Sequence, residues 1–449
     1  MPNAGSRAKP ENVLAWRLTL CLWILFLFEP FRLIGYYASG LAPLKWIPEL
    51  LLYGTSLLWV FSSGTKRHLK WFTAFFGLML LGTVIAFFLG NWGIARLMDR
   101  QMFQYYGLGV LTLTFCNSPQ RANTVLRVYL LSFLYYGIWG LISLRLAPLA
   151  DSADPGAREI VYWHIHYVNR DGFGPLMVMG FSLSYFLYSA VTTRLMKFLI
   201  VLSLVLCFLG IVISFGRGVF LAFLVVLGYI WFRTRHKVLF TVALAVMLVA
   251  FVASSPEFAS RYWATMKTIF SEGAAAGTGL DRKILWGWAW REFLFSPIFG
   301  VGTGNFGIAV FRVVGPSEMV ASGYTAGSLW GRVLHCAPMT VLCEYGLVGV
   351  TVALFLVRDF FRTNRRTRIF ARNLAVPGDT GSDRDNFFSP PSHVVTVSNG
   401  LNITFVATLV CAFFYELLYT PLIWHVIVIN RLAYIAALQT ATDDESGVI

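Results

Sequence analysis

About twelve apolar runs divide this 449-residue chain, and they constrain its fold more than any other feature. A helix needs about 20 apolar residues to cross the hydrocarbon core of a bilayer. The sequence therefore predicts an all-α polytopic membrane protein with about 12 transmembrane helices. The predicted spans are residues 15–35, 46–63, 71–90, 102–116, 127–146, 174–192, 198–215, 218–232, 238–254, 336–357, 401–417 and 418–439.

The composition supports this class of protein. Hydrophobic residues make up 57% of the chain and charged residues 13%, whereas soluble domains have about 45–50% and about 25%. An ordinary soluble enzyme, a disordered chain and a disulfide scaffold are therefore excluded. The formal net charge of +14 does not indicate a nucleic-acid partner, because most of the Lys and Arg residues stand at the ends of apolar runs.

The basic residues predict one orientation for all the spans. If the N-terminus is cytoplasmic, every basic cluster falls on the cytoplasmic side, as the positive-inside rule requires. Both termini are then cytoplasmic, and residues 440–449 form a cytoplasmic tail. The clusters are Arg7 and Lys9; Lys66 and Arg67; Arg121; Arg194 and Lys197; Arg233, Arg235 and Lys237; and Arg358, Arg362, Arg365, Arg366, Arg368 and Arg372.

Two long loops divide the chain on the opposite, outer side. Residues 1–254 hold the first nine helices and an outer loop at about 147–173. A larger outer loop covers residues 255–335, and residues 336–439 hold the last three helices with a cytoplasmic loop at about 358–400. The 374–400 part of that loop is rich in Pro, Gly, Ser and Asp, which is typical of a flexible segment.

An aromatic-rich stretch from Asp281 to Phe293 is predicted to be a helix within the larger outer loop. Arg282, Trp286 and Phe293 share one face at helical spacing. Because tryptophan favours the headgroup level of a bilayer, we expect this helix to lie along the outer membrane boundary. Trp286 is then placed either to stack on a sugar ring or to anchor the helix at the interface.

Three arginines on the outer side are candidate anion-binding residues. Arg217 lies between two glycines at a junction of two apolar runs, Arg282 begins the aromatic-rich helix, and Arg170 closes the first outer loop. A charge near the hydrocarbon is costly and points to function. The planar guanidinium binds phosphate with paired hydrogen bonds and stays charged. Taken singly, each is also compatible with a solvated or headgroup-anchoring arginine.

His335 is the candidate proton acceptor. It precedes an apolar run, and Pro338 suits the first turn of the helix that follows. An imidazole at the outer mouth of a helix is suited to take a proton near neutral pH. Arg332 is close enough in sequence to bind substrate or to cap the loop. Glu344, nine residues after His335, faces away from it on a helix, so we expect Glu344 to support helix packing.

Two other patterns predict structure rather than chemistry. The stretch from Gly300 to Asn305 is Gly-rich but follows a helix instead of a strand, so it indicates a tight turn after Pro297 and not a dinucleotide site. His164 and His166 have no nearby carboxylate or thiolate cluster, so no metal site is expected there.

These motifs resemble those of the O-antigen ligase family of membrane glycosyltransferases. Gly216-Arg217-Gly218 is similar to the family's Ser-Arg-Gly element, with Gly216 in place of the usual Ser. Arg282, Trp286, Pro297 and the glycines from Gly300 resemble its Arg-x-x-x-Trp … Pro-x-x-Gly-x-Gly element. His335, Glu344 and Gly346 resemble its His … Glu-x-Gly element, with Cys336 in place of the usual polar residue. The specific motifs cover about residues 210–350.

The resemblance implies a GT-C-like fold with a large helical periplasmic loop between helices 9 and 10. It also implies transfer of a glycan from undecaprenyl pyrophosphate to a sugar hydroxyl of lipid A–core on the periplasmic face of the bacterial inner membrane. No cofactor, metal or nucleotide sugar is expected. In that reaction Arg217, Arg282 and Arg170 would bind the pyrophosphate and His335 would deprotonate the acceptor. The oligomeric state stays open.

Other functions fit the sequence as well. A polymerase would use a second lipid-linked repeat as its acceptor, and a protein O-oligosaccharyltransferase would use a protein. A transporter of lipid-linked glycans belongs to another class, but transporters place ionisable residues near the middle of the bilayer. Here the arginines and the histidine are predicted at the outer face, which favours chemistry at the interface.

Overall fold

The computed structural model describes residues 10–29, 46–59, 69–90, 92–116, 118–146, 170–254, 259–260, 262–264, 266–267, 277–374 and 386–446. Over these residues the regular structure is helical, without a strand. The helices are α1 (Pro10–Phe28), α3 (Ile47–Trp59), α4 (Lys70–Phe88), α5 (Trp92–Phe115), α6 (Pro119–Leu146), α8 (Arg170–Leu187), η3 (Tyr188–Ala190), α9 (Arg194–Ile213), α10 (Arg217–Arg233), α11 (Lys237–Ser254), α13 (Gly277–Phe295), α14 (Phe306–Ala309), η4 (Val310–Arg312), α15 (Pro316–Ala321), α16 (Ala326–Leu329), α17 (Ala337–Leu374), α18 (Pro391–Ala412) and α19 (Pro421–Ser446).

Proline marks the start of several of these helices. α1, α6, α18 and α19 each begin with a proline. The first residue of a helix needs no N–H partner inside the helix, and the fixed φ of proline suits that position. The starts of α18 and α19 are therefore specified locally, although the spans predicted from hydropathy begin ten and three residues away.

Seven of the described helices are long and apolar enough to cross a membrane, and each of the twelve predicted spans falls on a helix. The shorter α3 and the 17-residue α10 do not reach the required length. α5 carries Arg96, Asp99 and Arg100 in its first half, which lowers its hydropathy. The seven are Lys70–Phe88, Pro119–Ile142, Gly172–Ala190, Arg194–Ile213, Ala337–Leu374, Pro391–Ala412 and Pro421–Gln439.

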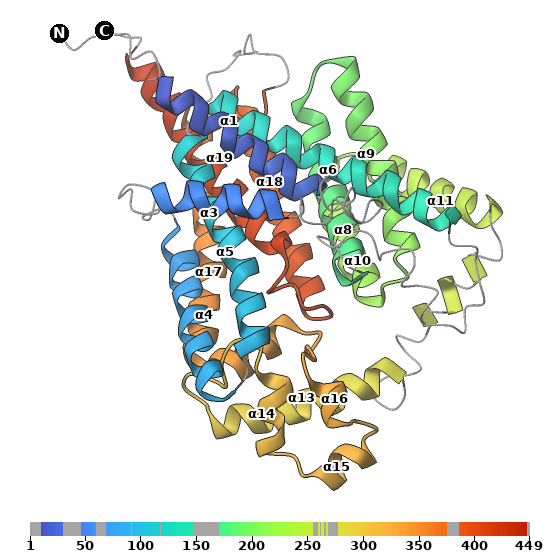
Figure 1. The fold of residues 1–449 in the computed structure, drawn as a ribbon. Helices are drawn as coiled ribbons and strands as arrows, with labels where there is room; N and C mark the ends of the chain where they lie inside the picture. Colours follow the sequence, from blue (N-terminus) through green and yellow to red (C-terminus); the bar gives the residue numbers. More distant parts are fainter. Residues whose placement is uncertain are drawn as a thin grey trace.

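The short helices α13 to α16 gather at one end of the molecule (Figure 1). The first turn of α1 and the last turns of α19 lie at the opposite end. α13 and α14 pack on α17, which connects this layer to the long helices. Leu285, Trp288, Phe306 and Leu329 form part of a small hydrophobic core within the layer. The aromatic-rich stretch is thus a helix, as predicted, and its inner face is buried against protein.

α17 is longer than the sequence predicts. Its 38 residues make it about 57 Å long at 1.5 Å per residue. The arginines from Arg358 to Arg372 therefore continue this helix instead of forming a loop. After the described part of the chain resumes at Asn386, α18 begins at Pro391. The described residues 358–374 and 391–400 of the predicted 358–400 loop are thus helical.

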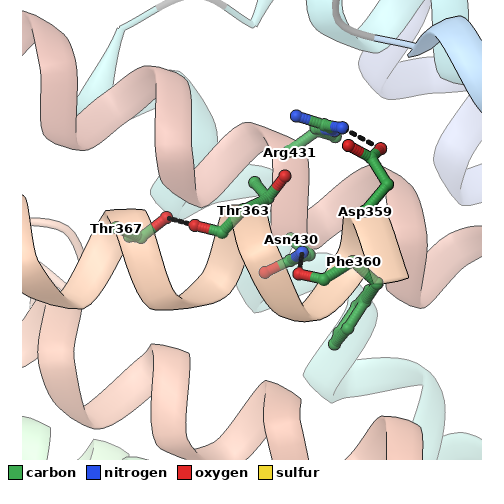
Figure 2. Close-up of polar contacts among 6 residues, drawn as sticks. All are labelled: Asp359, Phe360, Thr363, Thr367, Asn430 and Arg431. Atoms are coloured by element: carbon green, nitrogen blue, oxygen red, sulfur yellow. Dashed lines mark hydrogen bonds and ion pairs between the residues drawn. The ribbon is translucent and has the colours of Figure 1, made fainter. Parts of the chain in front are cut away.

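Buried polar contacts fix α17 against α18 and α19 in the half distant from the α13–α16 layer. Figure 2 shows Arg431 paired with Asp359, and the Asn430 amide donating to the Phe360 carbonyl at 3.1 Å. The Asn364 amide donates to the Ser398 carbonyl of α18 at 2.9 Å. Because buried polar groups are costly without partners, these bonds define how the three helices are oriented. Because these bonds hold both α18 and α19 against α17, they also set the position of the connection between α18 and α19 relative to α17.

Candidate functional site

The short connection between α18 and α19 brings the predicted site residues together. We name residues 413–420 the 413–420 loop. The Phe414 carbonyl accepts a hydrogen bond from Arg282 Nη2 at 3.0 Å. The Phe414 side chain packs directly on Gly218, and the Tyr415 hydroxyl lies against Gly216. The loop thus contacts both the α10 turn and α13.

The next residue of the loop reaches the helix that follows His335. Glu416 is buried and accepts a hydrogen bond from the Thr340 hydroxyl in the first turn of α17. Cys336 comes directly before α17, and both Glu416 and Arg282 act electrostatically on its thiol. The elements that carry Arg217, Arg282 and His335 therefore meet around three consecutive residues, Phe414 to Glu416.

Arg217 is the first residue of α10 and is half-buried. The N-terminal ends of helices favour anions because their first N–H groups have no partner within the helix. Arg170 begins the neighbouring α8, one helical turn before Gly174, whose backbone packs closely on Ser214 and Val219 beside Arg217. The starts of α8 and α10 are thus adjacent, while the Arg170 side chain lies outside the described part of the structure.

α13 holds the segment that leads to His335. Arg332 pairs with Asp281 at 2.7 Å, and the Trp286 indole N–H donates to the Leu334 carbonyl at 3.1 Å. His335 has a φ of 49°, a left-handed conformation that non-glycine residues rarely adopt. Asp281 and Trp286 of α13 therefore hold the segment that leads to His335, through Arg332 and the Leu334 carbonyl.

The electrostatic environment differs between the groups of this site. Burial raises the pKa of the Cys336 thiol to about 11, so it stays protonated at neutral pH and is not a thiolate nucleophile. Arg282 and His335 are half-buried, so they remain accessible. The site thus offers two cations, an imidazole and a buried carboxylate. That combination suits neutralisation of a departing anion and removal of a proton from a hydroxyl.

A comparison with family models tests the resemblance that the sequence suggested. The model described as O-antigen ligase matches residues 202–354. This match confirms the resemblance to the O-antigen ligase family. No curated protein matches the chain. Members of the family are glycosyltransferase-like enzymes, and the match includes Arg217, Arg282, Arg332, His335 and Glu344.

The 413–420 loop lies outside the residues that match the family model, and the sequence analysis missed it. The predicted spans 401–417 and 418–439 placed Tyr415 and Glu416 inside the membrane, whereas α18 ends at Ala412 and α19 begins at Pro421. The signal that could have found the loop is Glu416 itself. A carboxylate within an apolar run is costly and marks a functional or paired position.

The Gly-rich stretch that begins at Gly300 and the segment around Gly346 contact each other in this structure. α17 is kinked at Gly346, which has a φ of 61°. The kink frees the N–H groups of Leu347 and Val348, which donate to the carbonyls of Pro297 and Ile298 at 2.8 and 3.1 Å. A side chain at Gly346 would lie 2.5 Å from the Ile298 carbonyl oxygen. Gly346 therefore serves the docking of the 297–302 segment.

Glu344 stabilises the same contact between α17 and the Gly-rich turn. Its carboxylate accepts hydrogen bonds from the Gly304 N–H at 2.8 Å and from the Tyr419 hydroxyl. The N–H groups of Val301 and Gly302 donate to the carbonyls of Cys343 and Glu344, each at 3.0 Å. Glu344 is thus a structural group that joins the Gly-rich turn to the 413–420 loop. Its described partners are the backbone amides of Gly304 and Phe306 and the Tyr419 hydroxyl.

Glu292 is a buried carboxyl in the same outer layer that no motif singled out. It lies on α13 near Arg312 and Cys343 and is fully buried. Neither carboxyl oxygen has a hydrogen-bond partner in the described part of the chain. Burial raises the pKa of Glu292 to about 7, against the opposing effect of Arg312. Folding therefore favours the protonated form of this group.

We expect Glu292→Gln to stabilise the protein at pH 8 but not at pH 5. A raised folded-state pKa means that wild-type stability is complete below about pH 4.5 and is lost as pH rises toward 7. The amide avoids this loss because it does not ionise. Melting temperatures of the purified protein at the two pH values measure the effect. Exposed Glu318, whose pKa is lowered by Arg291, is the control, and Glu318→Gln should instead lower stability at pH 8. Equal pH dependence in wild type and Glu292→Gln would contradict the prediction.

Proposed function

We propose that this protein is an O-antigen ligase. It transfers a glycan from undecaprenyl pyrophosphate to a sugar hydroxyl of lipid A–core on the periplasmic side of the bacterial inner membrane, without a metal ion. One observation carries the proposal: the contacts of Phe414 to Glu416 join the α10 turn, Arg282 and the start of α17. These contacts bring together the elements that carry Arg217, Arg282 and His335, which supports a shared site for two cations and one proton acceptor.

The donor side of the site is assigned to the arginines. The pyrophosphate leaves with the electron pair of the bond between the anomeric carbon and its oxygen. Arg217 and Arg282 neutralise the charge that develops on it, which reduces the need for a general acid. Arg170, at the adjacent start of α8, is a third candidate for the same anion.

The acceptor side is assigned to His335. Its imidazole removes the proton of the acceptor hydroxyl as the oxygen attacks the anomeric carbon. One bond forms while the other breaks, so the anomeric configuration is inverted. Arg332 and Trp286 keep His335 in place through Asp281 and the Leu334 carbonyl. Glu416 lies within electrostatic reach of Cys336 and offsets part of the positive charge of Arg282 there.

Transfer by the purified protein tests this function. The donor is an undecaprenyl-pyrophosphate-linked glycan and the acceptor is lipid A–core, with and without EDTA. A core-linked product in both conditions is the expected result. A product that forms only after a divalent ion is restored would overturn the metal-free mechanism.

Other products would redirect the assignment. Longer chains that remain on the lipid carrier would identify a polymerase, and product on an added protein acceptor would identify a protein O-oligosaccharyltransferase. Movement of the carrier across vesicles with no glycan transfer would identify a transporter. Each of these outcomes would overturn the ligase assignment.

A further inference from the structure

Tyr415 occupies the space beside a missing side chain. Gly216 directly precedes α10, and a Cβ atom built on it would collide with the Tyr415 hydroxyl oxygen. The backbone of Gly216 has a φ of −82° and a ψ of 111°, which any residue adopts. The same Cβ atom would lie 2.8 Å from a methyl group of Val219, so the tyrosine and Val219, and not the backbone conformation, leave no room for a side chain here.

This place is the N-terminal end of the helix that Arg217 begins. The Phe220 N–H is bonded to the Gly216 carbonyl at 2.9 Å, so the N–H groups of residues 217–219 precede the first bond of the helix. Serine is a preferred residue at such a position because its hydroxyl reaches those groups or a ligand bound to them. Gly216 has no hydroxyl, but Tyr415 brings one to the same place from the 413–420 loop.

We propose that the Tyr415 hydroxyl binds the pyrophosphate of the lipid donor beside Arg217, in place of the side-chain hydroxyl that Gly216 lacks. The inference rests on the proposed function, because that function supplies the anion. A tyrosine O–H donates a hydrogen bond to a phosphate oxygen, and the end of α10 favours the same negative charge. Tyr415 is thus a determinant of donor binding that comes from the last loop of the chain.

Two other contacts hold the loop on either side of this hydroxyl. The backbone on either side of Tyr415 is held by the Arg282 bond to Phe414 and by the Thr340 bond to Glu416. The Gly216 N–H already donates to the Ser214 hydroxyl at 3.3 Å. Removing only the oxygen of Tyr415 therefore leaves the surrounding structure its other supports.

Binding of undecaprenyl pyrophosphate itself to the purified protein is the first test. Tyr415→Phe should weaken binding about tenfold, the effect of one hydrogen bond to a charged group. Glycan transfer is measured beside it, and the donor KM should rise by a similar factor while the acceptor KM stays unchanged. A purely structural tyrosine would instead lower stability and change both KM values.

Two double variants isolate the hydroxyl. Tyr415→Phe removes the nearest obstacle to a side chain at position 216, although a Val219 methyl group must still shift, so Gly216→Ser in that background should restore part of the binding. Gly216→Ala in the same background adds the same Cβ atom without the oxygen and should restore none. Equal binding by the serine and alanine double variants, or wild-type binding by Tyr415→Phe, would overturn the inference.

The two measurements separate this inference from the proposed function. Weaker lipid binding by Tyr415→Phe, in a protein that binds the lipid but transfers no glycan, would support the Tyr415 assignment and overturn the ligase. Normal glycan transfer together with unchanged lipid binding by Tyr415→Phe would support the ligase and overturn the Tyr415 assignment. A wild-type protein that does not bind undecaprenyl pyrophosphate would overturn both.

Discussion

His335→Ala is expected to abolish glycan transfer while the protein remains folded. General base catalysis contributes about 10²–10⁴-fold to a rate, and the acceptor hydroxyl is a weak nucleophile without it. Cys336 does not replace the imidazole, because burial raises the pKa of its thiol to about 11 and keeps it protonated. Initial rates with saturating donor and acceptor measure the loss.

A second variant separates the imidazole from the backbone at this position. His335 has a φ of 49°, and asparagine adopts this left-handed region more readily than other residues. His335→Asn should therefore fold like the wild type but remain inactive. Exposed His236, at the start of α11, is a matched control whose alanine variant should retain normal transfer. Activity of His335→Asn close to that of the wild type would remove the assignment of His335 as the base.

Arg282→Ala is expected to lower transfer by about 10²–10³-fold, the effect of losing one group that stabilises a developing anion. Arg282 Nη2 is committed to the Phe414 carbonyl. A planar guanidinium fork binds phosphate oxygens with paired hydrogen bonds. Lysine has a single ammonium at this position, so Arg282→Lys should recover less than about a tenth of the wild-type rate.

The matched control for Arg282 lies on the same helix. Arg291 is half-exposed and pairs with Glu318 at 2.9 Å. Exposed ion pairs contribute little, so Arg291→Ala should transfer glycan at nearly the wild-type rate. Full activity of Arg282→Lys would show that the site needs only a positive charge and would contradict the role of the fork.

The parts of the site that the sequence predicts are those with local signals. Arg217 lies between two glycines at a helix start, and Arg282 and Trp286 lie four residues apart on one helix. His335 precedes a proline-marked helix start. Hydropathy likewise placed each of the twelve spans on a helix, although it misjudged the ends of α17 and α18.

The parts that escaped prediction depend on contacts between distant residues. The carboxylate of Glu344 bonds to Tyr419, 75 residues later, and Glu416 bonds to Thr340, 76 residues earlier. No periodicity relates such positions. A hydropathy average also combines Glu416 with its apolar neighbours, so the 413–420 loop is predicted as part of the adjoining spans. The role of Gly346 was missed for the same reason, because its partner is the backbone of Pro297 and Ile298.

The position of the 413–420 loop near the end of the chain has a consequence for biosynthesis. Membrane segments emerge from the ribosome in order, so the residues from Arg217 to His335 are made well before Phe414, which lies 132 residues after its partner Arg282. Until α18 and α19 have entered the membrane, Arg282 lacks its carbonyl partner and Glu344 lacks Tyr419. The site that we propose is therefore complete only once α18 and α19 are in place.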